Sequence, residues 1–280
     1  MTTQRSQMAS AKKRRVDTCE TREPVNVECL QDLASRRGSG TVCWPGWDVS
    51  IRTVLQAYLG HVGSDGMLPV TWREGGSLTD FGFATRRYAG GGPGVSGRSL
   101  FCLPRVLRGC GRHGLWNTVD IDQDNSHFQA QLARHPGRPS LIQYTRERDA
   151  TLAAVVEAVG VTREDAKVLF LQLAYGGVAA NWCSSRGVDV KELPAFVHKF
   201  ASEQEEIRAE DAQKHPDLLA TIRAKPGDKR PEVSLQSQLN MRREREVLDA
   251  MGIAVRGVAD IAAYEHDGLF LYNPHLDPAD

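Results

Sequence analysis

Two strand-like stretches on either side of a long helical region place the strongest limit on the fold of this chain. Residues 115–122, LWNTVDID, are typical of a strand, and residues 255–273 read as strand, turn, strand. The turn of the second stretch, YEHDGLF, carries an acid at its tip. An Asp-Gly pair is common hairpin chemistry, so this acid has either a structural or a functional explanation. The chain therefore combines strands with long helices.

The helical region is marked by clear start and stop signals. Residues 162–175 open with Thr162 and Asp165, a pair that resembles a capping box, and end at Gly176-Gly177. Prolines and glycine in KPGDKRP, residues 225–231, break the region once. Further helices are expected over residues 147–160, 193–215 and 234–252. Earlier in the chain, Ile51, Leu55 and Leu59 have helical spacing.

Composition excludes several classes of protein. The 280 residues are 41% hydrophobic and 25% charged, with zero formal net charge, so the chain can bury a core and any basic surface must be local. It has no apolar run long enough for a membrane span and no apolar segment typical of a secretory signal. Its six cysteines form no Cys-x-x-Cys pair, which argues against a zinc site. We expect a nuclear or cytoplasmic protein, not a secreted one, with no membrane partner.

The N-terminal segment and a glycine-rich stretch are the expected flexible parts. Residues 1–40 are polar and poor in aromatic residues, so we expect a disordered basic tail followed by one domain over residues 41–280. The tail contains the basic run Lys12–Arg15. This run is typical of a nuclear address or a nucleic-acid contact, or of a solvated tail. Residues 89–99 are expected to form a connector, since they lack the Gly-Lys-Ser/Thr ending of a phosphate-binding loop.

Three acids emerge from the first strand. In VDIDQDNSHF, residues 119–128, alternation places Asp120, Asp122 and Asp124 on one face. Like charges on one face repel unless a positive group lies there, and a divalent metal ion is the natural partner. The alternative is an edge strand whose acids are solvated.

One helix presents a different chemistry. Arg163 and Lys167 are four residues apart and share a helix face, and Tyr175 follows eight residues later, about 80° around the helix. Such a helix can bind a triphosphate and cover a base. The alternative is an amphipathic surface helix whose Arg163 and Lys167 pair with nearby acids.

Together these stretches resemble the catalytic core of family A DNA polymerases. The middle motif of that family matches Arg163, Lys167, Tyr175 and Gly176 at full spacing, and the family's His-Asp hairpin matches His266-Asp267. Asp122, or alternatively Asp120, matches the acid after the first strand. Weaker matches are GRSLFCLPRVLR, residues 97–108, and SLQSQLN, residues 234–240, and the resemblance covers roughly residues 85–272.

The first motif is closer to divergent relatives in viruses and mobile elements. Asn125 and His127 stand where an acidic residue follows the catalytic aspartate in most of the family, and they favour Asp122 over Asp120 as the metal ligand. Leu171 stands where the family has a Phe or Tyr that stacks on the incoming nucleotide. This difference puts in doubt the selectivity for the sugar of that nucleotide.

The resemblance implies a template-directed DNA polymerase that uses two Mg²⁺ ions, binds a DNA primer-template and takes deoxynucleoside triphosphates. It implies a palm with an antiparallel sheet, in which the Asp267 hairpin lies beside the strand ending at Asp122, and a helical fingers subdomain. It implies the following roles: Asp122 and Asp267 as catalytic metal ligands; Arg163, Lys167, Tyr175 and His127 in nucleotide binding; Arg105, Arg108, Gln238 and His266 in nucleic-acid binding.

The length of the chain bears on its partners. A chain of 280 residues leaves no room for an exonuclease domain, and a long helical thumb is absent or very short, so a processivity or clamp partner is expected. Two alternatives stay open: a non-catalytic nucleic-acid-binding relic of such a polymerase, and a nuclear interaction protein that acts through its basic tail.

Overall fold

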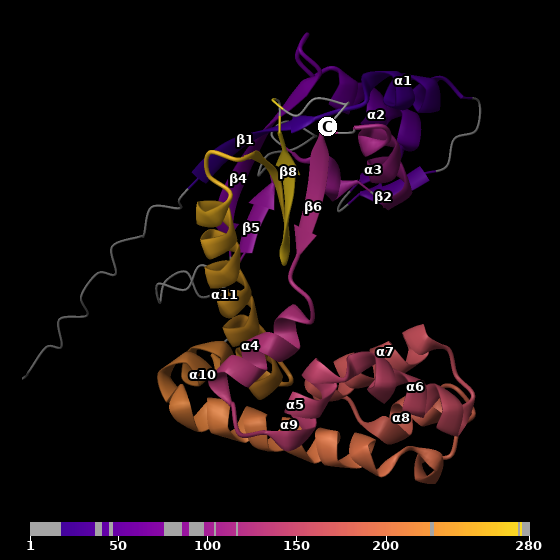
Figure 1. Ribbon diagram of the computed structural model, residues 1–280, viewed down its shortest axis with the longest axis vertical. Helices are drawn as coiled ribbons and strands as arrows, with labels where there is room; N and C mark the ends of the chain where they lie inside the picture. Colours follow the sequence, from indigo (N-terminus) through magenta and orange to yellow (C-terminus); the bar gives the residue numbers. More distant parts are fainter. Residues whose placement is uncertain are drawn as a thin grey trace, which may run out of the picture. The chain divides into compact units, whose positions relative to one another are not determined.

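The structure is a computed structural model that describes residues 18–36, 41–44, 47–75, 86–89, 98–103, 105–115, 117–224, 227–273 and 275 (Figure 1). The chain divides into two compact units. The first unit takes the residues up to Gln123 and those from Arg245 onward, and the second runs from Asp124 to Glu244.

Two three-stranded antiparallel sheets form the framework of the first unit. One has the order β1-β4-β5 and the other the order β6-β8-β7, while β2 and β3 form a separate hairpin. In the second sheet β6 pairs with β8, so that Asp122 lies opposite Gly268. The strand bounds are β1 (Thr18–Pro24), β2 (Thr41–Trp44), β3 (Trp47–Ser50), β4 (Met67–Gly75), β5 (Arg86–Ala89), β6 (Thr118–Asp122), β7 (Asp260–Glu265) and β8 (Gly268–Tyr272).

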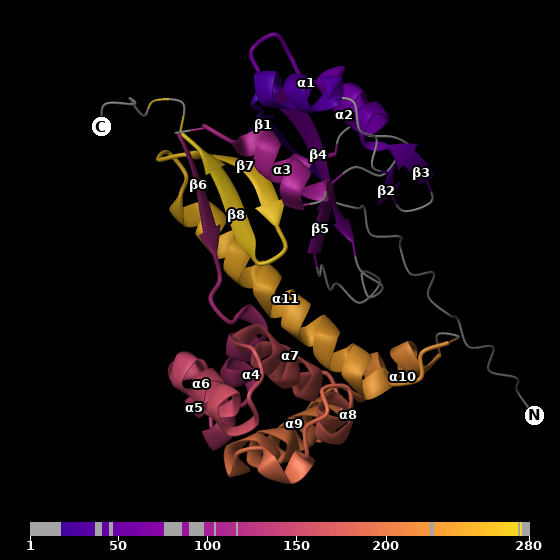
Figure 2. The same cartoon turned by 90° about the vertical axis from the view of Figure 1, so that its right-hand side faces the viewer.

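Helices cover both sheets of the first unit (Figure 2). The main core includes Leu30, Leu55 and Trp72 and continues to Ala263 and Phe270 on one face of the β6-β8-β7 sheet. The opposite face of that sheet presents Leu269 and Leu271, which pack against Leu248. The helices concerned are α1 (Val27–Ser35), α2 (Ile51–Leu59), the 3-10 turn η2 (Leu100–Cys102), α3 (Arg105–Arg112) and the C-terminal part of α11 (Pro231–Ala254).

The second unit is helical in the part of the chain that is described. Its core is rich in aromatic side chains, and a series of ring contacts connects Phe128, Tyr144, Phe170 and Phe200. The longest helix that lies wholly in this unit, α9, packs against α5 and α7. The helices are α4 (Ser126–Arg134), α5 (Pro139–Arg146), α6 (Arg148–Val159), α7 (Arg163–Ala174), α8 (Ala179–Ser184), α9 (Ala195–Lys214), α10 (Pro216–Arg223) and the N-terminal part of α11, with the 3-10 turn η3 (Val190–Glu192) between α8 and α9.

The expected α+β class and the antiparallel sheet are confirmed, and so is the position of the hairpin beside β6. The helices expected after residue 147 are present, with α6 and α7 within one residue of the expected bounds. No helix of the described residues is long and apolar enough to cross a membrane.

Three details of the expected fold are wrong. The segment 18–36, expected to be disordered, contains β1 and α1, because Glu23 and Leu30 are fully buried. Residues 255–259 belong to the turn after α11, and β7 begins at Asp260. Asp124 lies beyond β6 and forms an ion pair with Arg148, so it does not share the strand face of Asp120 and Asp122.

The basic run Lys12–Arg15 and most of the glycine-rich stretch lie outside the described residues.

Candidate functional site

Two aspartates meet where β6 ends and the β7–β8 hairpin turns. Asp122 is the last residue of β6 and faces Gly268 across the sheet, and Asp267 precedes Gly268 in the turn. The backbone N–H of Gln123 donates to the carbonyl of Asp267 at 3.1 Å, which extends the pairing by one step. Two residues separated by 145 positions in the sequence are thus neighbours because β6 and β8 are paired.

The hairpin turn has a backbone that allows this approach. His266 has φ 54°, in the left-handed region that non-glycine residues seldom adopt. Gly268 has no side chain where one would collide: a Cβ there would lie 2.8 Å from the Ile121 carbonyl oxygen and 3.0 Å from Asp122 Oδ1. The glycine therefore lets the Asp122 carboxylate lie against the hairpin.

The two carboxylates influence each other electrostatically. Partial burial raises the pKa of Asp122 above its ordinary value of 3.8, and repulsion from Asp267 raises it further. A hydrogen bond from the backbone N–H of Gln123 to Asp122 Oδ1, at 3.0 Å, acts in the opposite direction. Two acids held together in this way favour a cation between them.

The donor set fits Mg²⁺. Carboxylate oxygens are the ligands that Mg²⁺ prefers, and this ion usually keeps water and substrate phosphates as its remaining ligands. Within the described residues, no group of three or more His, Cys, Asp or Glu side chains is arranged to hold a metal ion by itself. A site in which two carboxylates bind the ion together with a phosphorylated substrate agrees with the ligand preference of Mg²⁺ and with the small number of ligating side chains.

A cluster of charged residues lies directly behind the hairpin. Arg112 of α3 contacts Glu23 of β1, Asp120 of β6 and Glu265 of β7. Arg108, one turn earlier, lies 3.8 Å from Glu265. Sequence reasoning did not single out Arg112, Glu23 or Glu265. The signal for Glu265 was its place directly before His266-Asp267, at the end of a strand.

The second unit contains the expected cationic helix. Thr162 caps α7 by accepting a hydrogen bond from the Asp165 backbone N–H at 3.1 Å, so Arg163 and Lys167 lie in its first two turns. Arg163 forms an ion pair with Asp149, and Lys167 lies 3.3 Å from Glu164. These are the pairs that the surface-helix alternative anticipates. Arg163 and both acids are exposed, whereas Lys167 is half-buried.

Tyr175 and His127 lie together in the second unit. The Tyr175 hydroxyl hydrogen-bonds with His127 Nδ1, and their rings meet edge to face at 5.7 Å. Asn240 Nδ2 donates to the same hydroxyl at 3.4 Å, and Glu244 Oε1 lies 3.6 Å from His127 Nε2. Both α11 residues are buried, and sequence reasoning missed them. Their spacing of four on one helix was the available signal.

The expected nucleic-acid contacts have different surroundings. Arg105 is exposed at the start of α3, and His266 is exposed at the hairpin tip. Arg108 is directed at protein groups, with its guanidinium 4.8 Å from the centre of the Phe101 ring. Gln238 is half-buried on α11.

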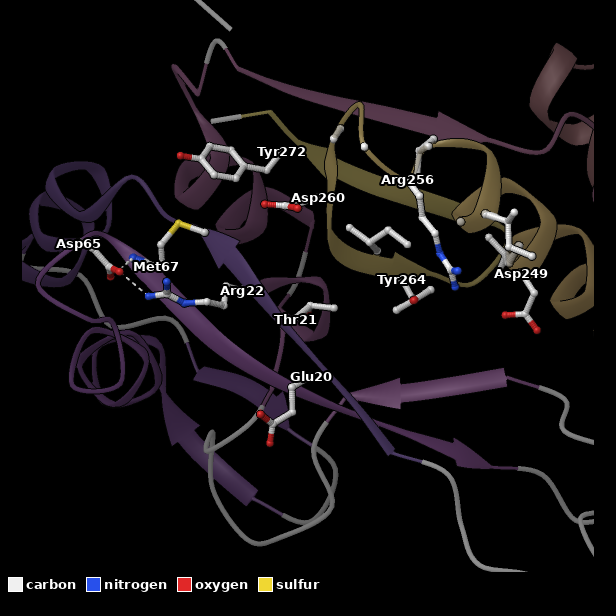
Figure 3. Close-up of a pocket in the computed structure, with 17 residues that line it drawn as sticks. Glu20, Thr21, Arg22, Asp65, Met67, Asp249, Arg256, Asp260, Tyr264 and Tyr272 are labelled. Atoms are coloured by element: carbon white, nitrogen blue, oxygen red, sulfur yellow. Dashed lines mark hydrogen bonds and ion pairs between the residues drawn. The ribbon is translucent and has the colours of Figure 1, made fainter. Parts of the chain in front are cut away.

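A separate pocket of about 940 Å³ opens in the first unit (Figure 3). Its lining combines an Arg22–Asp65 ion pair with Arg256, Asp260 and Tyr264. Neither Asp122 nor Asp267 lines it, so it is distinct from the carboxylate pair.

No family model matches the chain. The putative helicase V13 of Sputnik virophage is 26% identical over 257 residues, and the match covers 89% of this chain and 32% of that protein. The chain thus spans about a third of the length of this curated relative.

Among solved structures, the chain is similar to the POL domain of Pol1 from M. smegmatis, determined in complex with DNA primer-template and dNTP. The TM-score is 0.51 at 15% sequence identity, and the match covers 79% of this chain and 44% of that one. At this identity the likeness shows a polymerase-like fold.

Proposed function

We propose that this chain is a template-directed DNA polymerase of the family A type, which adds nucleotides to a primer 3′-hydroxyl. The observation that carries the proposal is the meeting of Asp122 and Asp267 at the end of β6. It is supported by a fold similar to that of a polymerase domain solved with primer-template and dNTP.

Asp122 and Asp267 would hold the magnesium ions. When bound, such ions activate the attacking hydroxyl and stabilise charge on the transferring and leaving phosphate oxygens. The contribution of the chain is to bring the two carboxylates together at one place. Pairing of β6 with β8 sets their separation, and Gly268 allows their approach.

Arg163 and Lys167 would bind the triphosphate. Their present partners, Asp149 and Glu164, are exposed, and exposed ion pairs contribute little to stability. A triphosphate carries more charge than either carboxylate, so both side chains can exchange partners at small cost. Positioning and charge neutralisation of this kind are the main protein contributions to phosphoryl transfer.

Tyr175 and His127 would form one wall of the nucleotide site. The buried Asn240 and the buried Glu244 orient the pair from α11. Arg105, His266 and Gln238 would contact the nucleic acid, with His266 nearest to the primer terminus because it adjoins Asp267. The contacts of Arg108 with Phe101 and Glu265 make a structural role for it the better proposal.

The similarity to a virophage protein favours an origin in a virus or mobile element. That relative is named a putative helicase, and the matched part is about a third of it. A clamp or processivity partner is also proposed, because the sequence contains no recognisable long helical thumb.

The test is primer extension with magnesium on wild type, four variants and one control variant. Asp122→Asn and Asp267→Asn are expected to abolish extension while DNA binding persists, because the shape is kept and the charge is lost. Asp120→Asn is expected to lose about tenfold or less, equivalent to about 1.4 kcal/mol of barrier. Loss in Asp120→Asn alone would show that Asp120 is the metal ligand.

The fourth variant tests the cationic helix. Lys167→Ala is expected to weaken nucleotide binding and to slow incorporation without unfolding the protein. Lys199→Ala, on the exposed face of α9, is the matched control and should behave as wild type. Equal kinetics in the two lysine variants would remove α7 from the nucleotide site.

The alternative is a nucleic-acid-binding protein without catalysis. Such a protein would bind DNA through salt-sensitive phosphate contacts and would not depend on magnesium. Binding that is unchanged by chelation of divalent ions, together with no extension by wild type, would establish this alternative.

A further inference from the structure

Arg112 joins three acids from three strands. It lies at the C-terminal end of α3, and its side chain is only 11% exposed. Its Nε donates to Glu23 Oε1 of β1 at 3.1 Å, and its Nη1 contacts both Glu265 of β7 and, at 3.9 Å, Asp120 of β6. One guanidinium thus reaches both sheets of the first unit.

Two of the acids that Arg112 contacts, Asp120 and Glu265, each lie close in sequence to one of the two proposed catalytic aspartates. Asp120 lies two residues before Asp122 on β6, and Glu265 lies two residues before Asp267 in the hairpin. We propose that Arg112 is a positioning residue: it holds these two neighbours together, and so makes the Asp122 and Asp267 carboxylates converge on a divalent cation. This inference rests on the proposed function and names a residue that the resemblance does not supply.

Arg112 is itself fixed to the core. Glu23 is fully buried, and its other oxygen accepts hydrogen bonds from Ser99 Oγ at 2.7 Å and the Leu100 N–H at 2.8 Å. The guanidinium lies 3.8 Å from the centre of the Phe270 ring. Desolvation lowers the pKa of Arg112, but Glu23 and Glu265 outweigh it, and the group stays charged. A planar fork with several donors can make these contacts together, whereas a lysine ammonium cannot.

Arg108 extends the same support to the hairpin tip. It lies 3.8 Å from Glu265 and over the Phe101 ring. Phe101 in turn meets the His266 ring edge to face at 4.8 Å. The residue in the left-handed conformation is therefore packed against a side chain that α3 holds in place.

Glu265→Gln is the better test variant because it leaves the anchor intact. Removing Arg112 would leave Glu23 as a buried, uncompensated charge, which is strongly destabilising. Glu265→Gln keeps the shape of the side chain and the Arg112–Glu23 pair, and it removes only the charge that attracts Arg112 to the hairpin. Asp260→Asn, at the other end of β7, is the matched control.

The primary readout is the affinity of the full chain for Mn²⁺ in the absence of nucleotide, measured by calorimetry or electron paramagnetic resonance. Residues that orient metal ligands affect metal affinity by about 10–100-fold, and we expect about a tenfold loss in Glu265→Gln. Asp260→Asn should bind as wild type, and Asp122→Asn should not bind. In primer extension, Glu265→Gln should lower kcat and leave KM for the nucleotide within about twofold, since the nucleotide contacts are untouched.

Arg112→Lys provides the second arm. It keeps a charge for Glu23, so the fold should survive, while Mn²⁺ affinity falls as in Glu265→Gln. Wild-type Mn²⁺ affinity in both folded variants would overturn the inference, as would the absence of Mn²⁺ binding in wild type. Weakened Mn²⁺ binding with no primer extension by wild type would support the positioning role and contradict the proposed polymerase function.

Discussion

At the scale of single residues, Asp122 shows a conflict between stability and function. Burial and repulsion from Asp267 raise its pKa in the folded protein, so ionisation of this carboxyl disfavours the folded state. In its protonated form, the Asp122 carboxyl adds to the stability of the folded protein. This contribution is complete below pH 3.8, the ordinary pKa, where the carboxyl is protonated in both the folded and the unfolded state. That contribution is lost as pH rises through the raised pKa. At neutral pH the acid is retained at a cost in stability.

The resulting prediction concerns Asp122→Asn. Without divalent cations at pH 7, we expect this variant to melt at a higher temperature than wild type, because the repulsion is gone. The difference should shrink as pH falls towards 3.8, and added MgCl₂ should raise the melting temperature of wild type alone. Differential scanning calorimetry measures both effects. A lower melting temperature for the variant at pH 7 would show that Asp122 is a stabilising residue in the folded protein.

At the scale of elements, the hairpin between β7 and β8 depends on Gly268. Gly268→Ala would place a Cβ 2.8 Å from the Ile121 carbonyl oxygen, and β6 would have to move. We expect a loss of about 1–3 kcal/mol in the free energy of unfolding, measured with urea, and weaker Mn²⁺ binding. Gly109→Ala on α3 has open space around it and should stabilise by about 0.5–1 kcal/mol. Equal stability of the two variants would contradict the close approach of β6 and β8.

A second element-scale prediction concerns the start of α7. Thr162→Ala removes the cap on Asp165 and should destabilise the protein by about 1 kcal/mol, whereas Thr162→Ser should not. Because the first turn then frays, Arg163 should bind nucleotide less well. Urea unfolding and nucleotide titration of the two variants provide the comparison, and identical curves would show that the cap is dispensable.

At the scale of the whole molecule, the described core clusters separate by unit. Leu55 belongs to a cluster of the first unit, and Phe200 belongs to a cluster of the second. Units with their own cores often unfold in separate steps. We expect calorimetry to resolve two transitions, with Leu55→Ala lowering one and Phe200→Ala lowering the other. A single transition that both variants shift equally would show that the two units unfold cooperatively.

The sequence by itself determined the local structure and the residue types of the site. Thr162, Asp165 and Gly176 marked the ends of α7 because capping is local chemistry, and the alternation around Asp122 marked β6. The resemblance in motif order then placed Asp267 beside Asp122, and the pairing of β6 with β8 agrees.

Only the tertiary structure decided which residues surround these motifs. β1 looked like part of a polar tail, yet burial of Glu23 against Arg112 makes it a strand of the framework. Asp124 followed the same alternation as Asp122 but lies past the strand end, where an ion pair with Arg148 holds it. Contacts such as Arg112 with Glu265, or Tyr175 with Asn240, join residues far apart in the chain. No local pattern encodes them, because they depend on how strands and helices pack.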